Sequence, residues 1–224
     1  MSRYSVLILV LSVFVAALSV GCSSQPLAAP DRVLSTPTVN GSSSSSALTA
    51  QSAADRDTKP VFWIGGSIIP GSSSLLIRND GGVTAAFHTS GLTAGNAYTM
   101  WFIVFNNRSA CLGPAPPQAP GAKCGFGDLS RAAVNSSVMY AAGHVVGDGD
   151  ADNLAGRRNV GDTDGVIAGP GLLNPRGAEI HVVVRNHGPA IPGLINEQIS
   201  SFNGGCPPNA CTNVQASVHP PHTP

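Results

Sequence analysis

The stretch "GAEIHVVVRNHGPAIPG", residues 177–193, has the pattern of a β-strand that is stopped by a Gly-Pro turn. Because successive side chains of a strand point to opposite faces, Ile180, Val182 and Val184 are predicted to line a core. The residues of the other face are polar apart from one valine: Glu179, His181, Val183 and Arg185, with His187 just beyond. This second face is either a functional site or the polar side of a structural strand.

The rest of the chain also favours strands. Only 11% of its residues are charged, and it contains 26 glycines and 18 prolines, so strong helix formers are scarce. Two extended runs flank Asn79-Asp80-Gly81-Gly82, which predicts a hairpin. The segment "GNAYTMWFIVFNN", residues 95–107, is apolar on both faces and is predicted to be a central strand. Further strands are expected over 138–146, 154–160 and, half-buried, 213–219, and no window of twelve residues has a helical period.

The turn "GLTAGNAYT", residues 91–99, indicates the type of all-β fold. Leu92, Gly95 and Tyr98 occupy the positions of the Leu-x-x-Gly-x-x-Tyr turn of immunoglobulin-like sandwiches, whose tyrosine hydrogen-bonds back to the backbone. We therefore predict one antiparallel, Greek-key-like, immunoglobulin-like β-sandwich over residues 60–219. A Pro-rich tail is expected over 220–224, and two histidines near this end, His219 and His222, are expected to be exposed.

The N-terminal segment has the pattern of an export signal. Residues 6–20 carry no charge and follow Arg3, which is typical of a signal peptide and short for a membrane span of about 20 residues. The segment ends in Gly21-Cys22, which resembles the lipobox of bacterial lipoproteins. Residues 1–21 are therefore predicted to be a lipoprotein signal peptide and Cys22 to carry the lipid; the alternative is an ordinary cleaved signal peptide.

Residues 22–59 are predicted to be a disordered tether between this anchor and the folded domain. They are rich in Ser, Ala, Pro and Thr, with five serines at 42–46, and have too few large apolar residues to offset the entropy of ordering. Ser23, rather than Asp, follows Cys22, which resembles outer-membrane sorting in a Gram-negative host. The expected protein is thus exported and bound to a membrane of the cell envelope through Cys22.

The cysteine count supports export. The chain has five cysteines, and assigning Cys22 to lipid leaves four. Four cysteines in an exported protein indicate two disulfides with three possible connectivities. Proximity favours the pairs Cys111–Cys124, around the Pro-rich loop 114–120, and Cys206–Cys211. Zinc on these cysteines is disfavoured because no pair has a C-x-x-C spacing.

The histidines are the candidate metal ligands. A site that uses His181 and His187 needs a third ligand from a neighbouring strand, such as His144 or His88, and imidazole suits zinc or copper. The favoured alternative is a structural polar face, on which the charged side chains pair across strands and the histidines bond to loop backbone. The candidate ligand-binding or metal-binding residues are His144, His181, His187, Glu179 and Arg185.

Two acidic turns are weaker candidates for calcium. The segment "DGDADN", residues 148–153, matches the first three ligand positions of an EF-hand, but Asn153 stands in place of the Gly and Asn159 in place of the Glu. A turn between strands explains its composition equally well. The turn "GDTDG", residues 161–165, could share an ion with it. The candidate calcium ligands are Asp148, Asp150, Asp152, Asp162 and Asp164.

Other chemistries have no sequence support. The chain contains no G-x-S-x-G elbow, H-E-x-x-H motif, Walker loop or Rossmann fingerprint. Without Arg3 it has eleven basic and twelve acidic residues and no basic patch, so nucleic acid is not expected as a partner. These absences favour a non-catalytic binding or structural role without a cofactor, with zinc or copper binding as the alternative.

Longer stretches of the chain resemble a group of bacterial exported proteins of unknown function. The resemblance covers most of residues 87–219 and implies no activity and no catalytic residues. It rests on "GLTAGNAYTMWFIVFNN", "YAAGHVVGDG", "GAEIHVVVRNHGPAIPG", "EQISSFNGGC" and "CTNVQASVH". The order of these motifs is also similar to CHRD-type domains, which are extracellular β-sandwich modules. Copper–zinc superoxide dismutases have a related sandwich, but this chain lacks their closely spaced His-x-His ligands.

Overall fold

A computed structural model describes residues 54–113, 121–149 and 151–221. Within this part the longest helix is the four-residue α1, and no helix has the length and hydropathy needed to cross a membrane. Nine strands make up most of the fold: β1 (Asp55–Trp63), β2 (Ile68–Asn79), β3 (Gly82–Ser90), β4 (Asn96–Phe105), β5 (Ser136–Val145), β6 (Ala151–Asn159), β7 (Val166–Ala168), β8 (Glu179–Pro189) and β9 (Thr212–His219). The helical segments are η1 (Arg108–Ala110), η2 (Phe126–Asp128), η3 (Ala132–Val134) and α1 (Ile195–Gln198). Several predicted features lie outside the described residues. They are the signal peptide, Cys22, tether residues 22–53, loop 114–120, Asp150 and residues 222–224, including His222.

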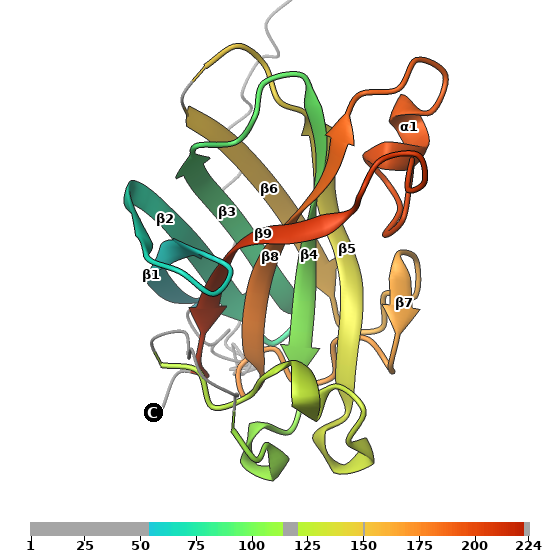
Figure 1. The fold of residues 1–224 in the computed structure, drawn as a ribbon. Helices are drawn as coiled ribbons and strands as arrows, with labels where there is room; N and C mark the ends of the chain where they lie inside the picture. Colours follow the sequence, from blue (N-terminus) through green and yellow to red (C-terminus); the bar gives the residue numbers. More distant parts are fainter. Residues whose placement is uncertain (1–53, 114–120, 150, 222–224) are drawn as a thin grey trace, which may run out of the picture. The chain divides into compact units, whose positions relative to one another are not determined.

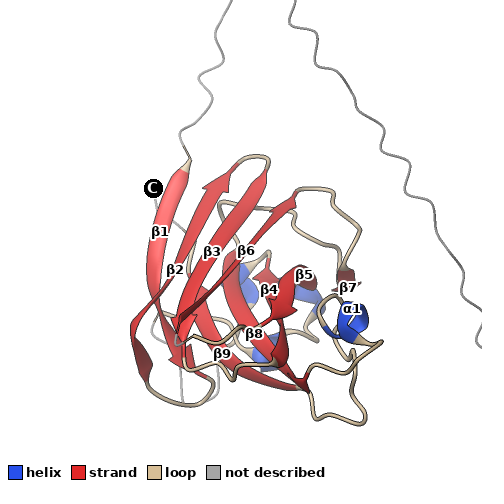
Figure 2. Ribbon diagram, turned by 90° about the horizontal axis from the view of Figure 1, so that it is seen from above, coloured by secondary structure: helices blue, strands red, loops and turns tan. Residues whose placement is uncertain are grey.

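The nine strands form one antiparallel sheet in the order β6-β3-β2-β1-β9-β8-β4-β5-β7. The sheet curls, so the half with β1, β2, β3 and β6 packs face to face against the half with β4, β5 and β8 (Figures 1 and 2). At Gly156 of β6 a Cβ atom would lie 2.5 Å from the carbonyl oxygen of Ala141 in β5, so these two strands approach closely. The predicted all-β, antiparallel sandwich is confirmed, in the form of a sheet that packs against itself.

The quoted strand and the apolar strand 95–107 form the centre of this sheet. β8 pairs with β4 on one side and with β9 on the other, and β4 pairs with β8 and β5. Ile180, Val182 and Val184 are fully buried in the main core, as their alternation predicted. They pack there with inward-facing residues of both halves, including Val61, Leu76, Phe87, Met100, Phe102, Met139 and Leu154.

Two local turn predictions are also correct. The β2–β3 hairpin closes at Asn79, which pairs with Gly82, and the Asn79 side chain accepts a hydrogen bond from the Gly81 N–H at 2.9 Å. At the corner before β4, the Tyr98 hydroxyl accepts a hydrogen bond from the Thr93 N–H at 2.9 Å. Gly95 has a φ of +78°, which glycine adopts without steric cost, so this turn needs a glycine at that position.

The two ends of the domain differ from expectation. β1 begins at Asp55, so residues 55–59, which were assigned to the tether, form a strand that pairs with β2. From residue 215 to residue 219, β9 is buried on both faces rather than half-buried, because Gln215 and His219 lie inside the curled sheet and Ala216 packs in a second, smaller core. His219, which was expected to be exposed, is consequently fully buried.

The polar side chains that β9 buries are hydrogen-bonded. Gln215 accepts a hydrogen bond from Thr89 at 2.7 Å, and the His219 Nε2 lies 2.9 Å from the Ser74 hydroxyl. Arg78 of β2 is buried beside them, and burial lowers its pKa to about 10. Its guanidinium donates to the backbone carbonyls of Pro175, Ala178, His219 and Pro220. These bonds satisfy groups whose burial would otherwise be costly.

Candidate functional site

Glu179 begins the outer face of β8 and is a buried acceptor. Its side chain is fully buried, and the carboxylate accepts four donors: Arg108 Nε at 2.6 Å, Lys123 N at 3.1 Å, Cys124 N at 2.8 Å and His181 Nε2 at 2.9 Å. Burial alone raises the pKa of Glu179, but the hydrogen bonds from His181, Cys124 and Arg108 outweigh it, and the pKa is lowered overall. The carboxylate is therefore ionised and fully occupied within the fold.

These bonds hold a disulfide-closed loop on the outer face of the sheet. Arg108 lies on the first limb of the loop and Lys123 and Cys124 on the second, and the Cys111–Cys124 disulfide joins the limbs with a Cα–Cα distance of 5.2 Å. This pairing is one of the two that proximity favoured. Under the loop lies a second small core made of Ile103, Phe105, Cys111, Cys124, Val134, Val183 and Ala216. Glu179 thus fixes both limbs of the loop over the strands β4 and β8.

Arg185 holds a different segment on the same face. Its Nε donates to the Phe202 carbonyl at 2.8 Å, and its guanidinium carbon lies 4.1 Å from the centroid of the Phe202 ring. Its Nη1 donates to the Asn213 side chain at 3.0 Å and its Nη2 to the Asn203 side chain at 3.3 Å. Every nitrogen of this guanidinium is therefore engaged within the protein, and Phe202 and Asn213 are held in place.

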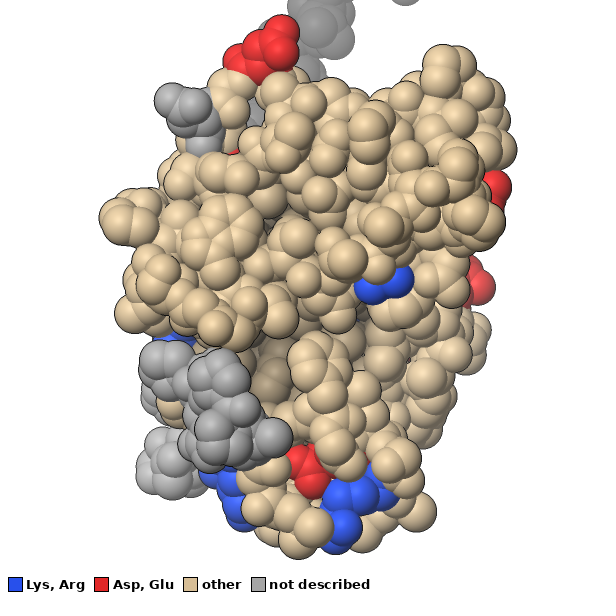
Figure 3. All heavy atoms as spheres, in the orientation of Figure 1, with Lys and Arg blue, Asp and Glu red and all other residues tan. Residues whose placement is uncertain are grey.

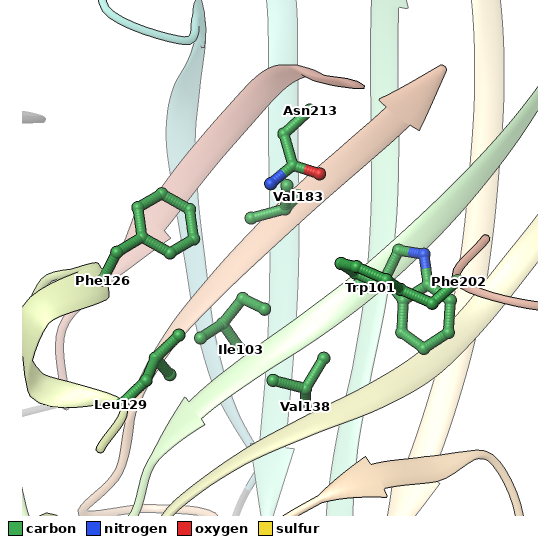
Figure 4. A pocket seen from close by; sticks show the side chains of 8 residues that line it. All are labelled: Trp101, Ile103, Phe126, Leu129, Val138, Val183, Phe202 and Asn213. Carbon is green, nitrogen blue, oxygen red and sulfur yellow. The ribbon is translucent and has the colours of Figure 1, made fainter. Parts of the chain in front are cut away.

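An apolar cavity of about 220 Å³ lies between these two held segments. We call it the outer-face pocket, and its lining residues are Trp101, Ile103, Phe126, Leu129, Val138, Val183, Phe202 and Asn213. Figure 4 shows Phe126 and Leu129 on one side, Trp101 and Phe202 on the opposite side, and Ile103 with Val183 between them. The face of the domain seen in Figure 1 has few charged side chains across its middle, and most of its Lys and Arg atoms gather at the lower end (Figure 3).

Asn213 is the one amide side chain among the described residues that line this pocket. Its Oδ1 accepts from Arg185, while its Nδ2 has no hydrogen-bond partner within the part of the chain that the structure describes. The aromatic wall opposite Phe126 is rigid, because the Trp101 and Phe202 rings meet edge to face at 5.1 Å and the Trp101 Nε1 donates to Thr99 at 2.7 Å. The pocket therefore offers apolar surface and one hydrogen-bond donor, which suits an uncharged ligand.

The candidate histidines do not meet. His181 and His187 lie on the same face of β8, and six residues at about 3.3 Å each separate them by roughly 20 Å, whereas ligands lie about 2 Å from a shared ion. His144 bonds to Asp152 at 2.7 Å, and His88 bonds to Asn153 at 2.8 Å. The structure thus does not assemble the proposed site of His144, His181 and His187.

The acidic turns do not meet either. Asp152 lies at the start of β6, and Asp162 follows its end, where its carboxylate accepts the Asn159 N–H at 2.7 Å. Asp152 and Asn159 are seven residues apart along the strand, which corresponds to roughly 23 Å, so Asp152 and Asp162 cannot share an ion. Asp148 and Asp164 are exposed. The acidic segment follows β5 and leads into β6. This agrees with the alternative explanation of its composition, a turn between two strands.

A different group of ligand-type side chains does come together. His187, Cys206 and Cys211 form the only set of three His, Cys, Asp or Glu side chains, within the described ranges, whose ligand atoms lie within 4.8 Å of one another. Cys206 and Cys211 form the second disulfide that proximity favoured. Sequence spacing could not place His187 beside it, because the contact depends on how residues 188–211 return to the sheet.

Comparison with protein-family models, with curated proteins and with solved structures found no match. The resemblance to bacterial exported proteins and to CHRD-type domains therefore remains a prediction. The function must be inferred from the geometry of the outer-face pocket and from the N-terminal sequence.

Proposed function

We propose that this chain is a lipid-anchored, non-catalytic protein of a bacterial cell envelope that binds a small, uncharged aromatic molecule in the outer-face pocket. The observation that carries the proposal is the pocket itself, about 220 Å³ in volume, apolar, and bounded by aromatic rings. An engineered cavity of about 150 Å³ holds benzene, so this volume accommodates a molecule of one or two rings. Asn213 supplies one donor to orient the ligand.

The charged residues around the pocket support a binding role rather than catalysis. Glu179 accepts four donors, and all the guanidinium nitrogens of Arg185 are engaged, so neither is available to transfer a proton or to bind a charged substrate. Both residues fix the walls of the pocket, Glu179 through the loop that leads to Phe126 and Arg185 through Phe202. A pocket fixed in this way binds with a smaller loss of conformational entropy.

The binding test uses indole as the probe, with the Trp101 side-chain N–H signal in NMR as the readout. We expect saturable shifts in the full-length protein and at least tenfold weaker binding, about 1.4 kcal/mol, in Leu129→Trp, which puts a larger side chain among the residues that line the pocket. Ile167→Ala is the matched control, because Ile167 is an exposed apolar residue of β7 that does not line the pocket. Absence of shifts up to the solubility of indole, or equal binding by Leu129→Trp, would overturn the proposed binding role.

The anchor has its own test. The lipobox at Gly21-Cys22, the tether and two disulfides, which belong to oxidising compartments, support export and anchoring. We expect the protein to fractionate with membranes and the Cys22→Ala variant to remain unprocessed and unlipidated, while Ser23→Ala still receives lipid. Mass spectrometry of the N-terminus is the measurement. A Cys22→Ala protein that is processed and fractionated like the parent would contradict the anchor but not the pocket.

A further inference from the structure

We infer that the Cys206–Cys211 disulfide is a thiol-exchange site, which His187 activates by hydrogen-bonding to the Cys211 sulfur. The Cys111–Cys124 disulfide, in contrast, resists reduction by the same dithiol. His187 is fully buried on the outer face of β8. Its Nδ1 lies 3.0 Å from the Gly204 carbonyl oxygen and 3.2 Å from the Cys211 Sγ. Its Nε2 lies 2.7 Å from the Thr99 hydroxyl.

These contacts fix the tautomer of the imidazole. A carbonyl oxygen only accepts, so the Nδ1 that faces Gly204 carries the hydrogen. Burial lowers the pKa of His187, so the ring is neutral at neutral pH and the Nε2 accepts the Thr99 hydroxyl hydrogen. The N–H therefore points at the Gly204 oxygen and at the Cys211 sulfur. This tautomer disfavours a metal ion at His187, Cys206 and Cys211, because the Nδ1 lone pair is not free to bind it.

The same N–H stabilises the product of reduction. When the disulfide opens, a Cys211 thiolate would lie 3.2 Å from a fixed donor, the His187 N–H, and the positive charge of Arg185 acts on this same imidazole. A neighbouring donor and positive charge lower the pKa of a thiol and make it the better leaving group. Cys206 and Cys211 are both partly exposed, so a reductant can reach them.

The other disulfide has the opposite environment. Cys124 is fully buried and Cys111 nearly so, and the Cys124 N–H donates to the buried carboxylate of Glu179. That negative charge disfavours a thiolate next to it, and burial keeps a reductant away. The chain therefore contains its own control, one disulfide beside an imidazole N–H and one beside a carboxylate.

The reaction partner is a dithiol. Its thiolate attacks the Cys206 Sγ, the sulfur–sulfur bond breaks, and the electron pair leaves on the Cys211 Sγ, which accepts the His187 N–H bond. The second thiol of the reductant loses its proton to solvent, and its thiolate attacks the reductant sulfur of the mixed disulfide and releases Cys206. Cys206 takes a proton from solvent, and Cys211 exchanges one with solvent according to its pKa. The dithiol is oxidised to its own disulfide, and the protein gains two thiols, so two electrons are transferred in all.

The first experiment equilibrates the full-length protein in buffers of reduced and oxidised dithiothreitol, traps thiols with iodoacetamide, and locates the modified cysteines by mass spectrometry. We expect Cys206 and Cys211 to be modified where Cys111 and Cys124 remain joined, with equilibrium constants that differ at least tenfold, about 30 mV for two electrons. Reduction of both disulfides at the same potential, or of Cys111–Cys124 first, would overturn the inference.

The second experiment identifies the leaving thiol. Cys206→Ser leaves the Cys211 thiol and Cys211→Ser leaves the Cys206 thiol, and the rate of alkylation of each is followed against pH. We expect the Cys211 thiol to titrate clearly below the ordinary value of about 8.5 and the Cys206 thiol close to it. Adding His187→Gln to Cys206→Ser should raise the Cys211 value. If that double variant fails to fold, the two serine variants still decide, because equal titration of their thiols contradicts the role of His187.

Discussion

Glu179→Gln is expected to lower the free energy of unfolding by about 2–3 kcal/mol, the cost of removing a buried charged acceptor from its hydrogen-bond donors. Glutamine has nearly the same shape, but it loses the charge and turns an NH₂ group toward donors that the carboxylate now accepts. The Arg108 guanidinium and the N–H groups of Lys123 and Cys124 would lack an acceptor of equal strength. Urea unfolding of the two proteins measures the difference.

A matched control is available because the chain has one other glutamate. Glu197 of α1 is exposed, so Glu197→Gln should change the free energy of unfolding by no more than about 0.5 kcal/mol. A double-mutant cycle with Arg108→Ala then separates the ion pair from the rest, since Arg108→Ala should cost less in the Glu179→Gln background than in the parent. A loss of less than about 1 kcal/mol in the free energy of unfolding of Glu179→Gln would show that this carboxylate does not hold the disulfide-closed loop on the sheet.

Local patterns in the sequence were enough to predict the architecture. The alternation of Ile180, Val182 and Val184 located a core strand, and the Asn79–Gly82 turn and the Tyr98 corner follow from residue types with specific backbone roles. The disulfide pairing followed from short separations, 13 and 5 residues, which short loops close at little cost. Each of these features depends on residues that are neighbours in the chain.

The role of the polar row on β8 depends on residues that are distant in the chain. Apart from His181, the partners of Glu179 lie at 108 and 123–124, and those of Arg185 lie at 202–203 and 213, so no spacing within residues 177–193 could identify these distant partners. One signal is nevertheless present in the sequence. Six residues of strand separate His181 from His187 by about 20 Å, and this spacing alone argues against a metal ion shared by the two imidazoles.

The burial of His219 was missed for a related reason. A final strand with alternating polar residues is typical of a sheet with one face in water, and Gln215, Ser217 and His219 fit that pattern. The curled sheet covers the face that carries these polar side chains, and the second small core under the disulfide-closed loop covers Ala216 on the other face. Polar side chains buried in this way need hydrogen-bond partners inside the protein, and those of His219 are Ser74 and Asp57.

This buried histidine should make the protein lose stability in mild acid. Burial lowers the pKa of His219 from 6.5 to about 4, and the positive charge of Arg78 acts in the same direction, whereas Asp57, whose carboxylate is 3.3 Å away, opposes the shift in part. Between pH 6.5 and pH 4 the unfolded chain binds a proton at this residue that the folded protein does not. The contribution of neutral His219 is therefore complete above pH 6.5 and is lost as the pH falls toward 4.

The expected loss is about 3 kcal/mol, because each pKa unit between 6.5 and about 4 corresponds to about 1.4 kcal/mol. The measurement compares urea unfolding of the parent and of His219→Gln at pH 7 and pH 4. Glutamine keeps a hydrogen-bonding group toward Ser74 and does not titrate, so the variant should lose about 3 kcal/mol less than the parent over this range. His187 and Glu179 titrate in both proteins, and their contributions cancel in the comparison. Equal losses in the two proteins would mean that His219 takes up its proton in the folded state as readily as in the unfolded chain.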